Sequence, residues 1–149
     1  MRLIEVLGLI FVVANFVVVL LLPKPRDLNI ALGWALYAAS IGLFWWSVRT
    51  TRDRPLSWAF SWGQPDHLVV TGPYRLVRHP FYSSYLCAWV AGVLTTAFFP
   101  LVVCVVLMAF LYLRASECEE RKFLETSFKD EYADYKAKTA KFVPLIFLL

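Results

Sequence analysis

The chain has 149 residues, of which 60% are hydrophobic, 17% aromatic and 17% charged, and its formal net charge is +4 at pH 7. So apolar a composition excludes an ordinary soluble domain and a disordered chain, because both need more polar surface to remain in water. The length suits one compact unit, and no internal repeat, low-complexity tract or Gly/Ser linker divides it. We therefore expect a single membrane-embedded domain over residues 1–149.

The first predicted element is a membrane-spanning helix over residues 3–22, which at about 1.5 Å per residue is long enough to cross roughly 30 Å of hydrocarbon. This run is longer than the apolar core of a typical signal peptide, and no small-residue cleavage site follows it. The proline-rich segment LLPKPRDLN then leads into a second predicted span over residues 28–48. That span ends in an aromatic cluster of the kind found at membrane–water interfaces.

A polar loop over residues 49–79 separates the second span from a third, predicted over residues 81–99. Pro100 can occupy the first turn of a helix and therefore predicts a fourth span over residues 100–116. The uncharged run from Leu101 to Leu113 has only 13 residues. We expect this helix to begin in the FFP turn and to continue past Arg114 into water, forming a hairpin with the third span.

The C-terminal segment carries a different pattern. Apolar and aromatic residues recur there at intervals of three and four on a basic background: Leu124, Phe128, Tyr132 and Tyr135. Such spacing is typical of an amphipathic helix on a membrane surface. The predicted fold class is therefore all-α, an integral membrane bundle of about four transmembrane helices with a cytosolic C-terminal amphipathic helix.

The distribution of charge predicts the orientation of this bundle. Thirteen of the 15 Lys and Arg residues fall on one side of the four-span arrangement, and only Lys24 and Arg26 fall on the other. Positive residues favour the cytoplasmic side of short loops, so both termini should be cytoplasmic. The short loops favour a prokaryotic cell membrane over an endoplasmic reticulum membrane, and the oligomeric state stays open.

Metal and nucleic-acid functions find no support in the sequence. The three cysteines and two histidines lack the paired spacing of a disulfide framework or a zinc site. No nucleic-acid-binding motif accompanies the positive charge, which fits anionic membrane lipids instead.

Two charged clusters are expected to meet at the cytoplasmic end of the hairpin. The segment GPYRLVRHPFYSSY, residues 72–85, carries cations and aromatic rings, and Glu117, Glu119 and Glu120 follow the fourth span. Separately, each cluster could be a set of interfacial anchors, and together they could form only a salt bridge. A zwitterionic ligand also fits, because its carboxylate suits Arg and its ammonium suits Glu.

The segments DHLVVTGPYRLVRHPFY and EERKFLETSFKDEYADYKAKTAKFVP together resemble the core of the isoprenylcysteine carboxyl methyltransferase and phospholipid methyltransferase superfamily. The resemblance covers about residues 66–144 and implies a pocket for S-adenosyl-L-methionine. It implies cofactor-binding roles for ten residues: His67, Leu68, Val69, Tyr74, His79, Pro80, Phe81, Tyr82, Glu119 and Glu120. In this comparison Arg78 would stand at the mouth of the acceptor tunnel, and Arg114 is the candidate for a second acceptor-binding arginine.

The function implied by the resemblance is methyl transfer from S-adenosylmethionine to a lipophilic or lipid-anchored acceptor that enters from the bilayer. Carboxyl O-methylation of the isoprenylcysteine type is the favoured reaction, because an arginine beside the pocket would align an anion. N-methylation of a phospholipid or another amine is the alternative, and Glu119 or His79 would then be candidate bases. More remote alternatives are an NADPH-dependent sterol-type reductase and a membrane scaffold without enzymatic activity.

Overall fold

The computed structural model describes residues 14–15, 17, 19–21, 28–52, 65, 67–96 and 98–144. Most of the predicted first span, residues 3–22, lies outside these ranges, and the few residues of it that are described are helical. The apolar tail beyond residue 144 also lies outside them.

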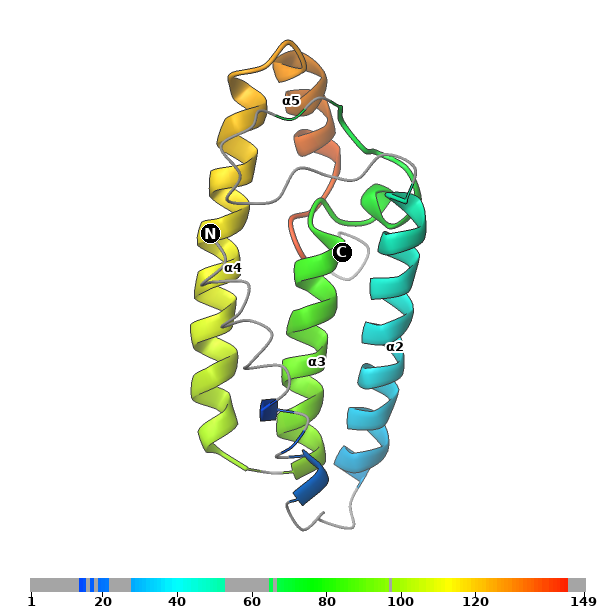
Figure 1. Ribbon diagram of the computed structural model, residues 1–149, viewed down its shortest axis with the longest axis vertical. Coiled ribbons are helices and arrows are strands. Elements are labelled where there is room, and N and C mark those ends of the chain that lie inside the picture. Colours follow the sequence, from blue (N-terminus) through cyan, green and yellow to red (C-terminus); the bar gives the residue numbers. More distant parts are fainter. Residues whose placement is uncertain are drawn as a thin grey trace. The chain divides into compact units, whose positions relative to one another are not determined.

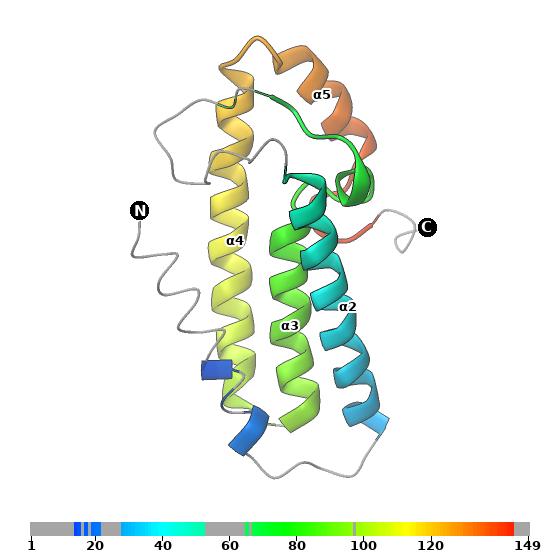
Figure 2. The ribbon, with the colours of Figure 1, turned by 45° about the vertical axis from the view of Figure 1, so that its right-hand side comes forward.

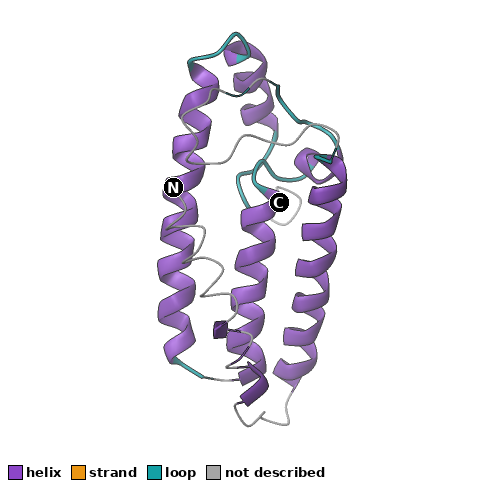
Figure 3. Cartoon of the chain, in the orientation of Figure 1, coloured by secondary structure: helices purple, strands orange, loops and turns teal. Residues whose placement is uncertain are grey.

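All regular elements in the described ranges are helices (Figure 3). They are α2 (Leu28–Thr50), the short 3-10 helix η1 (Gly72–Arg75), α3 (Pro80–Thr96), α4 (Pro100–Leu124) and α5 (Lys129–Lys138). The only extended pairing among the described residues is an isolated parallel bridge between Val77 and Ala140. The predicted all-α class is confirmed.

The helix bounds differ from the predicted spans where polar side chains bond to the backbone. The third predicted span reached residue 99, but α3 ends at Thr96, whose hydroxyl donates to the Gly92 carbonyl at 2.7 Å. The same Thr96 oxygen accepts the Phe98 N–H at 3.2 Å, which turns the chain out of the helix. Pro100 begins α4 as expected, and α4 continues well past the predicted end of its span to Leu124.

The expected C-terminal amphipathic helix is shorter than its sequence pattern suggested. Leu124 ends α4, and α5 begins only at Lys129, so the apolar spacing crosses a turn. At this turn the Thr126 hydroxyl donates to the Phe123 carbonyl at 2.8 Å and its oxygen accepts the Phe128 N–H at 3.2 Å. These bonds replace helical ones and separate the two helices. Within α5 only Tyr132 is buried.

Two of the described helices are long and apolar enough to cross a membrane. They are residues Ile30–Thr50, with a mean hydropathy of 1.3, and Pro100–Leu124, with a mean hydropathy of 2.0. Only 17% and 22% of their apolar windows are buried inside the structure, which leaves wide apolar faces for a non-aqueous surrounding. With 17 residues, α3 is short for a span, and the four-span arrangement stays a prediction.

The chain divides into two compact units, of which the first comprises Met1–Ile41 and Ser84–Phe110. Figures 1 and 2 show residues 28–41 of α2 beside residues 84–96 of α3 in this unit. A side chain at Gly33 would meet the Thr95 Cγ2 atom at 2.5 Å, so the two helices approach closely there. Small residues allow such backbone approach between membrane helices.

The second unit comprises Gly42–Ser83 and Leu111–Leu149. It contains η1, α5 and the ends of α2, α3 and α4 that adjoin the charged segments. Gly72 opens η1 with φ +58°, and a Cβ atom at this position would meet the Thr50 Oγ1 atom at 2.4 Å. Glycine therefore allows η1 to pass directly against the end of α2.

Candidate functional site

The start of α3 places two cations next to the C-terminal strap, which we define as residues 139–142. Pro80 occupies the first position of α3, where its missing N–H needs no partner. The Arg78 N–H donates to the Ala140 carbonyl at 2.8 Å, and the His79 N–H donates to the Lys141 carbonyl at 3.2 Å. The strap therefore fixes the backbone from which both cationic side chains project.

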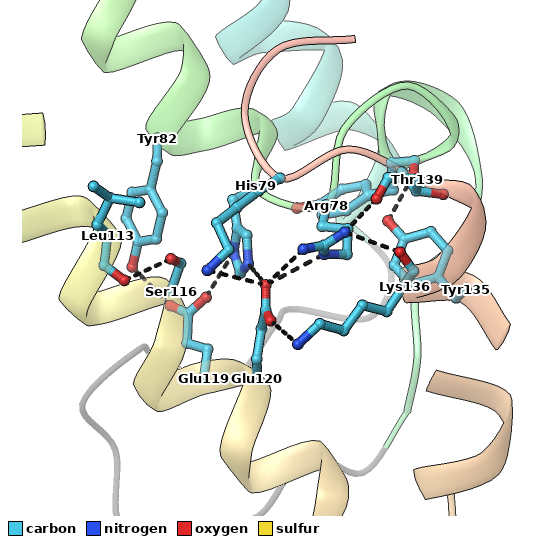
Figure 4. A network of polar contacts seen from close by, with 12 residues as sticks. Arg78, His79, Tyr82, Leu113, Ser116, Glu119, Glu120, Tyr135, Lys136 and Thr139 are labelled. Atoms are coloured by element: carbon cyan, nitrogen blue, oxygen red, sulfur yellow. Dashed lines mark hydrogen bonds and ion pairs between the residues drawn. The ribbon is translucent and has the colours of Figure 1, made fainter. Parts of the chain in front are cut away.

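The polar end of α4 supplies two neighbouring carboxylates that make different contacts (Figure 4). Glu119 accepts a hydrogen bond from the Tyr82 hydroxyl at 2.7 Å and lies 3.1 Å from Nδ1 of His79. Glu120 lies 3.2 Å from Nε2 of the same imidazole. The basic segment and the acidic pair meet in the second unit, as the sequence predicted.

Glu120 is almost fully buried, with 4% of the residue exposed, and four cationic side chains surround its carboxylate. Its Oε1 atom accepts hydrogen bonds from Nε and Nη2 of Arg78, both at 3.2 Å. The Lys136 Nζ atom lies 2.8 Å from Oε2, and the Lys141 Nζ atom lies 3.7 Å from Oε1. Burial opposes ionisation, but hydrogen bonds from His79 and Lys136 and the nearby charges hold the pKa of Glu120 well below its usual range.

His79 lies between the two carboxylates with both ring nitrogens engaged. Only the imidazolium form can donate from both nitrogens at once, and one carboxylate lies at each. Burial alone would lower the pKa of His79, but the hydrogen bonds to Glu119 and Glu120 and their negative charges raise it above its ordinary value. The ring therefore acts as a cationic link between the two acids.

Arg78 is held on two sides. Besides its bonds to Glu120, its Nη1 atom donates to the carbonyls of Lys136, at 3.2 Å, and of Thr139. Only 9% of the arginine side chain is exposed. Arg78 therefore ties the end of α5 and the strap to the acidic end of α4.

Aromatic rings line one side of this charged cluster. The ring of Tyr82 stacks on that of Tyr112 with centroids 5.1 Å apart and on the His79 imidazole at 5.7 Å. Phe142 of the strap contacts both His79 and Tyr82, with centroids 5.9 and 6.4 Å away. Such flat faces can receive a purine or a sulfonium cation.

Tyr74 carries a buried hydroxyl that has no hydrogen-bond partner within the described ranges, although only 5% of the residue is exposed. Burial raises the pKa of Tyr74, and the charges of Glu119 and Tyr135 raise it further. The Tyr74 carbonyl accepts the Tyr135 hydroxyl at 2.6 Å, which anchors η1 to α5. An unsatisfied buried donor of this kind is a point where a ligand can bind.

The remaining predicted site residues lie on the loop before η1, in α3 and in α4. His67, Leu68 and Val69 are half-buried on the loop before η1. Phe81 packs edge-on against Phe44 with centroids 5.6 Å apart. Arg114 is 67% exposed and pairs with Glu117 at 3.6 Å along its own helix.

Sequence reasoning missed several contributors to the site: Tyr112, Lys136, Thr139, Lys141 and Phe142. Tyr112 precedes Glu119 by seven residues, which is two turns of a helix, so this spacing could have placed both on one face of α4. The strap residues carry no such signal, because a long-range backbone pairing brings them to the site.

Comparison with known protein families gives a match. The described residues form an all-helical structure, with two helices long and apolar enough to cross a membrane and a buried cluster of charged side chains in the second unit. The family model described as phospholipid methyltransferase matches residues 28–131, well over half of the chain, so the chain belongs to that family. The resemblance to membrane methyltransferases is confirmed. The chain matches no curated protein and no solved structure.

Proposed function

We propose that this protein transfers a methyl group from S-adenosylmethionine to the amine head group of a phospholipid. The observation that carries the proposal is the carboxylate pair Glu119 and Glu120, held by His79 and Tyr82 in a chain of the phospholipid methyltransferase family. The cofactor supplies an electrophilic methyl group on a sulfonium, and the protein supplies position and a dry site.

The residues of the second unit suit the polar groups of this cofactor. A carboxylate such as Glu120 would bind its ammonium group, and the unsatisfied Tyr74 hydroxyl would meet a polar group of its nucleoside. That nucleoside would be flanked by His67, Leu68 and Val69. The adjoining wall of the cofactor site would be formed by Pro80, Phe81 and Tyr82. Together with His79 and Glu119, these residues form the proposed cofactor site.

An amine acceptor fits the contacts of Arg78 better than a carboxylate does. Its guanidinium already donates to Glu120 and to the carbonyls of Lys136 and Thr139, which leaves few of its N–H groups for an acceptor anion. The Glu119 side chain is 25% exposed and presents a negative charge to an incoming ammonium. We assign Glu119 the role of attracting the amine and accepting the proton that it must release before methylation.

A carboxyl acceptor of the isoprenylcysteine type is the second candidate, and the observation that favours it is Arg114. This arginine is 67% exposed at the polar end of α4 and could align a carboxylate. A carboxylate would need no base, because its unperturbed pKa of about 3.5 leaves it ionised near neutrality.

The two acceptors are distinguished by reconstituting the protein in vesicles with labelled S-adenosylmethionine. One vesicle preparation contains phosphatidylethanolamine, the other a prenylated cysteine analogue in a phosphatidylcholine bilayer. We expect label in the amine phospholipid, with a rate that rises about tenfold per pH unit below the effective pKa of the amine. Label only in the prenylated acid, with a nearly flat rate from about pH 5.5 to 8, would replace the proposal with carboxyl methylation.

A further inference from the structure

The two oxygen atoms of Glu120 have partners of different kinds. Oε1 accepts from Arg78 and His79, whose side chains are each only 9% exposed, so these two partners are fixed by packing. The Lys141 ammonium lies farther from Oε1, at 3.7 Å. The Lys136 ammonium lies 2.8 Å from Oε2. The Lys136 side chain is 49% exposed and has a long flexible stem. Oε1 therefore has partners that are fixed by packing, whereas the partner of Oε2 can move away.

A ligand ammonium would need the oxygen atom that Lys136 now holds. The ligand ammonium and the Lys136 ammonium are both primary ammonium groups, with the same charge and the same hydrogen-bonding capacity. Displacing Arg78 or His79 would leave a buried cation without its carboxylate, which is costly. Releasing Lys136 costs less, because its half-exposed ammonium returns to water while the ligand ammonium takes its place on the buried carboxylate.

We propose that Lys136 is a resident counter-ion that occupies the ligand-ammonium position on Glu120 and is exchanged when an amino-acid-type ligand binds. This inference rests on the proposed function, because it assigns Glu120 to the ammonium group of S-adenosylmethionine or its product. Lys136 thereby lowers affinity, while Arg78 and His79 keep the carboxylate in place. The exchange conserves charge, since one ammonium replaces another on the same oxygen.

The first test is calorimetric titration with S-adenosylhomocysteine of the full chain in detergent. Lys136→Met should bind it about two- to fivefold more tightly than the unmodified protein, because the competing ion pair is half-exposed. Lys138→Met is the matched control, since it removes the same charge from an exposed position on the same helix. It should leave the affinity unchanged.

Two further comparisons separate exchange from a general charge effect. Lys136→Arg keeps the charge and should not tighten binding, because a guanidinium can still hold the carboxylate. Methylthioadenosine has no amino-acid portion, so its affinity should be the same for Lys136→Met and the unmodified protein. Tighter binding of methylthioadenosine by Lys136→Met would contradict the proposed exchange of ammonium groups on Glu120.

The second test follows the lysine itself. The full chain is briefly exposed to an amine-reactive reagent with and without saturating S-adenosylhomocysteine, and the labelled peptides are measured by mass spectrometry. Labelling of Lys136 should increase on ligand binding, while that of Lys138 stays constant. Unchanged or reduced labelling, or weaker binding by Lys136→Met, would overturn the inference while leaving the cofactor assignment intact. If the unmodified protein does not bind S-adenosylhomocysteine at all, the proposed function itself is wrong.

Discussion

His79 is the residue whose protonation state most directly connects the site to pH. A carboxylate lies beside each ring nitrogen, and the pKa of the imidazole is raised as a result. A raised pKa in the folded state means that His79 contributes stability fully below about pH 6.5, the ordinary histidine value. This contribution is lost as the pH rises through the raised pKa.

We therefore expect the thermal unfolding temperature in detergent to fall as the pH rises above about 6.5, until His79 is neutral in the folded state. His79→Gln should be less stable at low pH and should lack this decline, because glutamine does not titrate. His67→Gln keeps the linking imidazole and should follow the unmodified protein. A decline of equal size in His79→Gln would show that another group is responsible.

At the scale of single residues, the sequence predicted the site residues that lie beside or within predicted helices. It missed the residues that reach the site from distant parts of the chain. Arg78 and His79 immediately precede α3, and Glu119 and Glu120 lie near the polar end of α4, so an expected hairpin was enough to pair them. Lys136 reaches the same carboxylate through the fold of the C-terminal segment, and no local spacing indicates that path.

Among the secondary-structure elements, η1 depends on a single glycine. Gly72 has φ +58°, and an added Cβ atom would lie 2.4 Å from the Thr50 Oγ1 atom, which already donates to the Trp46 carbonyl. Gly72→Ala therefore introduces both backbone strain and a close contact. We expect it to reduce the free energy of unfolding by about 1–2 kcal/mol or more.

Gly42→Ala provides the matched comparison, because a Cβ atom at Gly42 on α2 would meet nothing within 4 Å. Alanine is the better helix former by about 1 kcal/mol, so this variant should be neutral or slightly more stable. Both are measured by denaturant unfolding in the same detergent. Equal destabilisation by the two variants would contradict the role given to η1.

The helices themselves were predictable from apolar runs, whereas their ends were not. Pro100 marks the start of α4 because proline suits a first turn, and the structure agrees. The ends of α3 and α4 follow from hydroxyl bonds made by Thr96 and Thr126. Threonine also occurs inside helices, so its presence alone does not predict which one ends a helix.

For the whole molecule, the distribution of positive charge predicts which ends face the cytoplasm. Cysteines are introduced singly at Asn29, Thr50 or Ser127, after replacement of Cys87, Cys104 and Cys118. In intact cells, an impermeant thiol reagent should label Asn29→Cys and should not label the other two. All three should react after permeabilisation. Labelling of positions 29 and 50 from the same side would contradict the four-span arrangement.

Titration of the purified protein with S-adenosylhomocysteine tests most directly whether the charged cluster binds S-adenosylmethionine through Glu120. Glu125→Gln removes an exposed carboxylate and should bind like the unmodified protein. Glu120→Gln should bind more weakly by roughly 1.5–3 kcal/mol, the contribution of a hydrogen bond to a charged group. Its unfolding temperature is recorded in parallel, so that only folded protein is compared.

NADPH in the same titration should produce no binding heat, because the site is assigned to a sulfonium nucleoside with an amino-acid group. We expect the protein to bind S-adenosylhomocysteine and not NADPH, with the affinity weakened by Glu120→Gln and unaffected by Glu125→Gln. Binding of NADPH without S-adenosylhomocysteine would indicate a reductase, and binding of neither would indicate a scaffold. Equal affinities of the two glutamine variants for S-adenosylhomocysteine would contradict the assignment of Glu120.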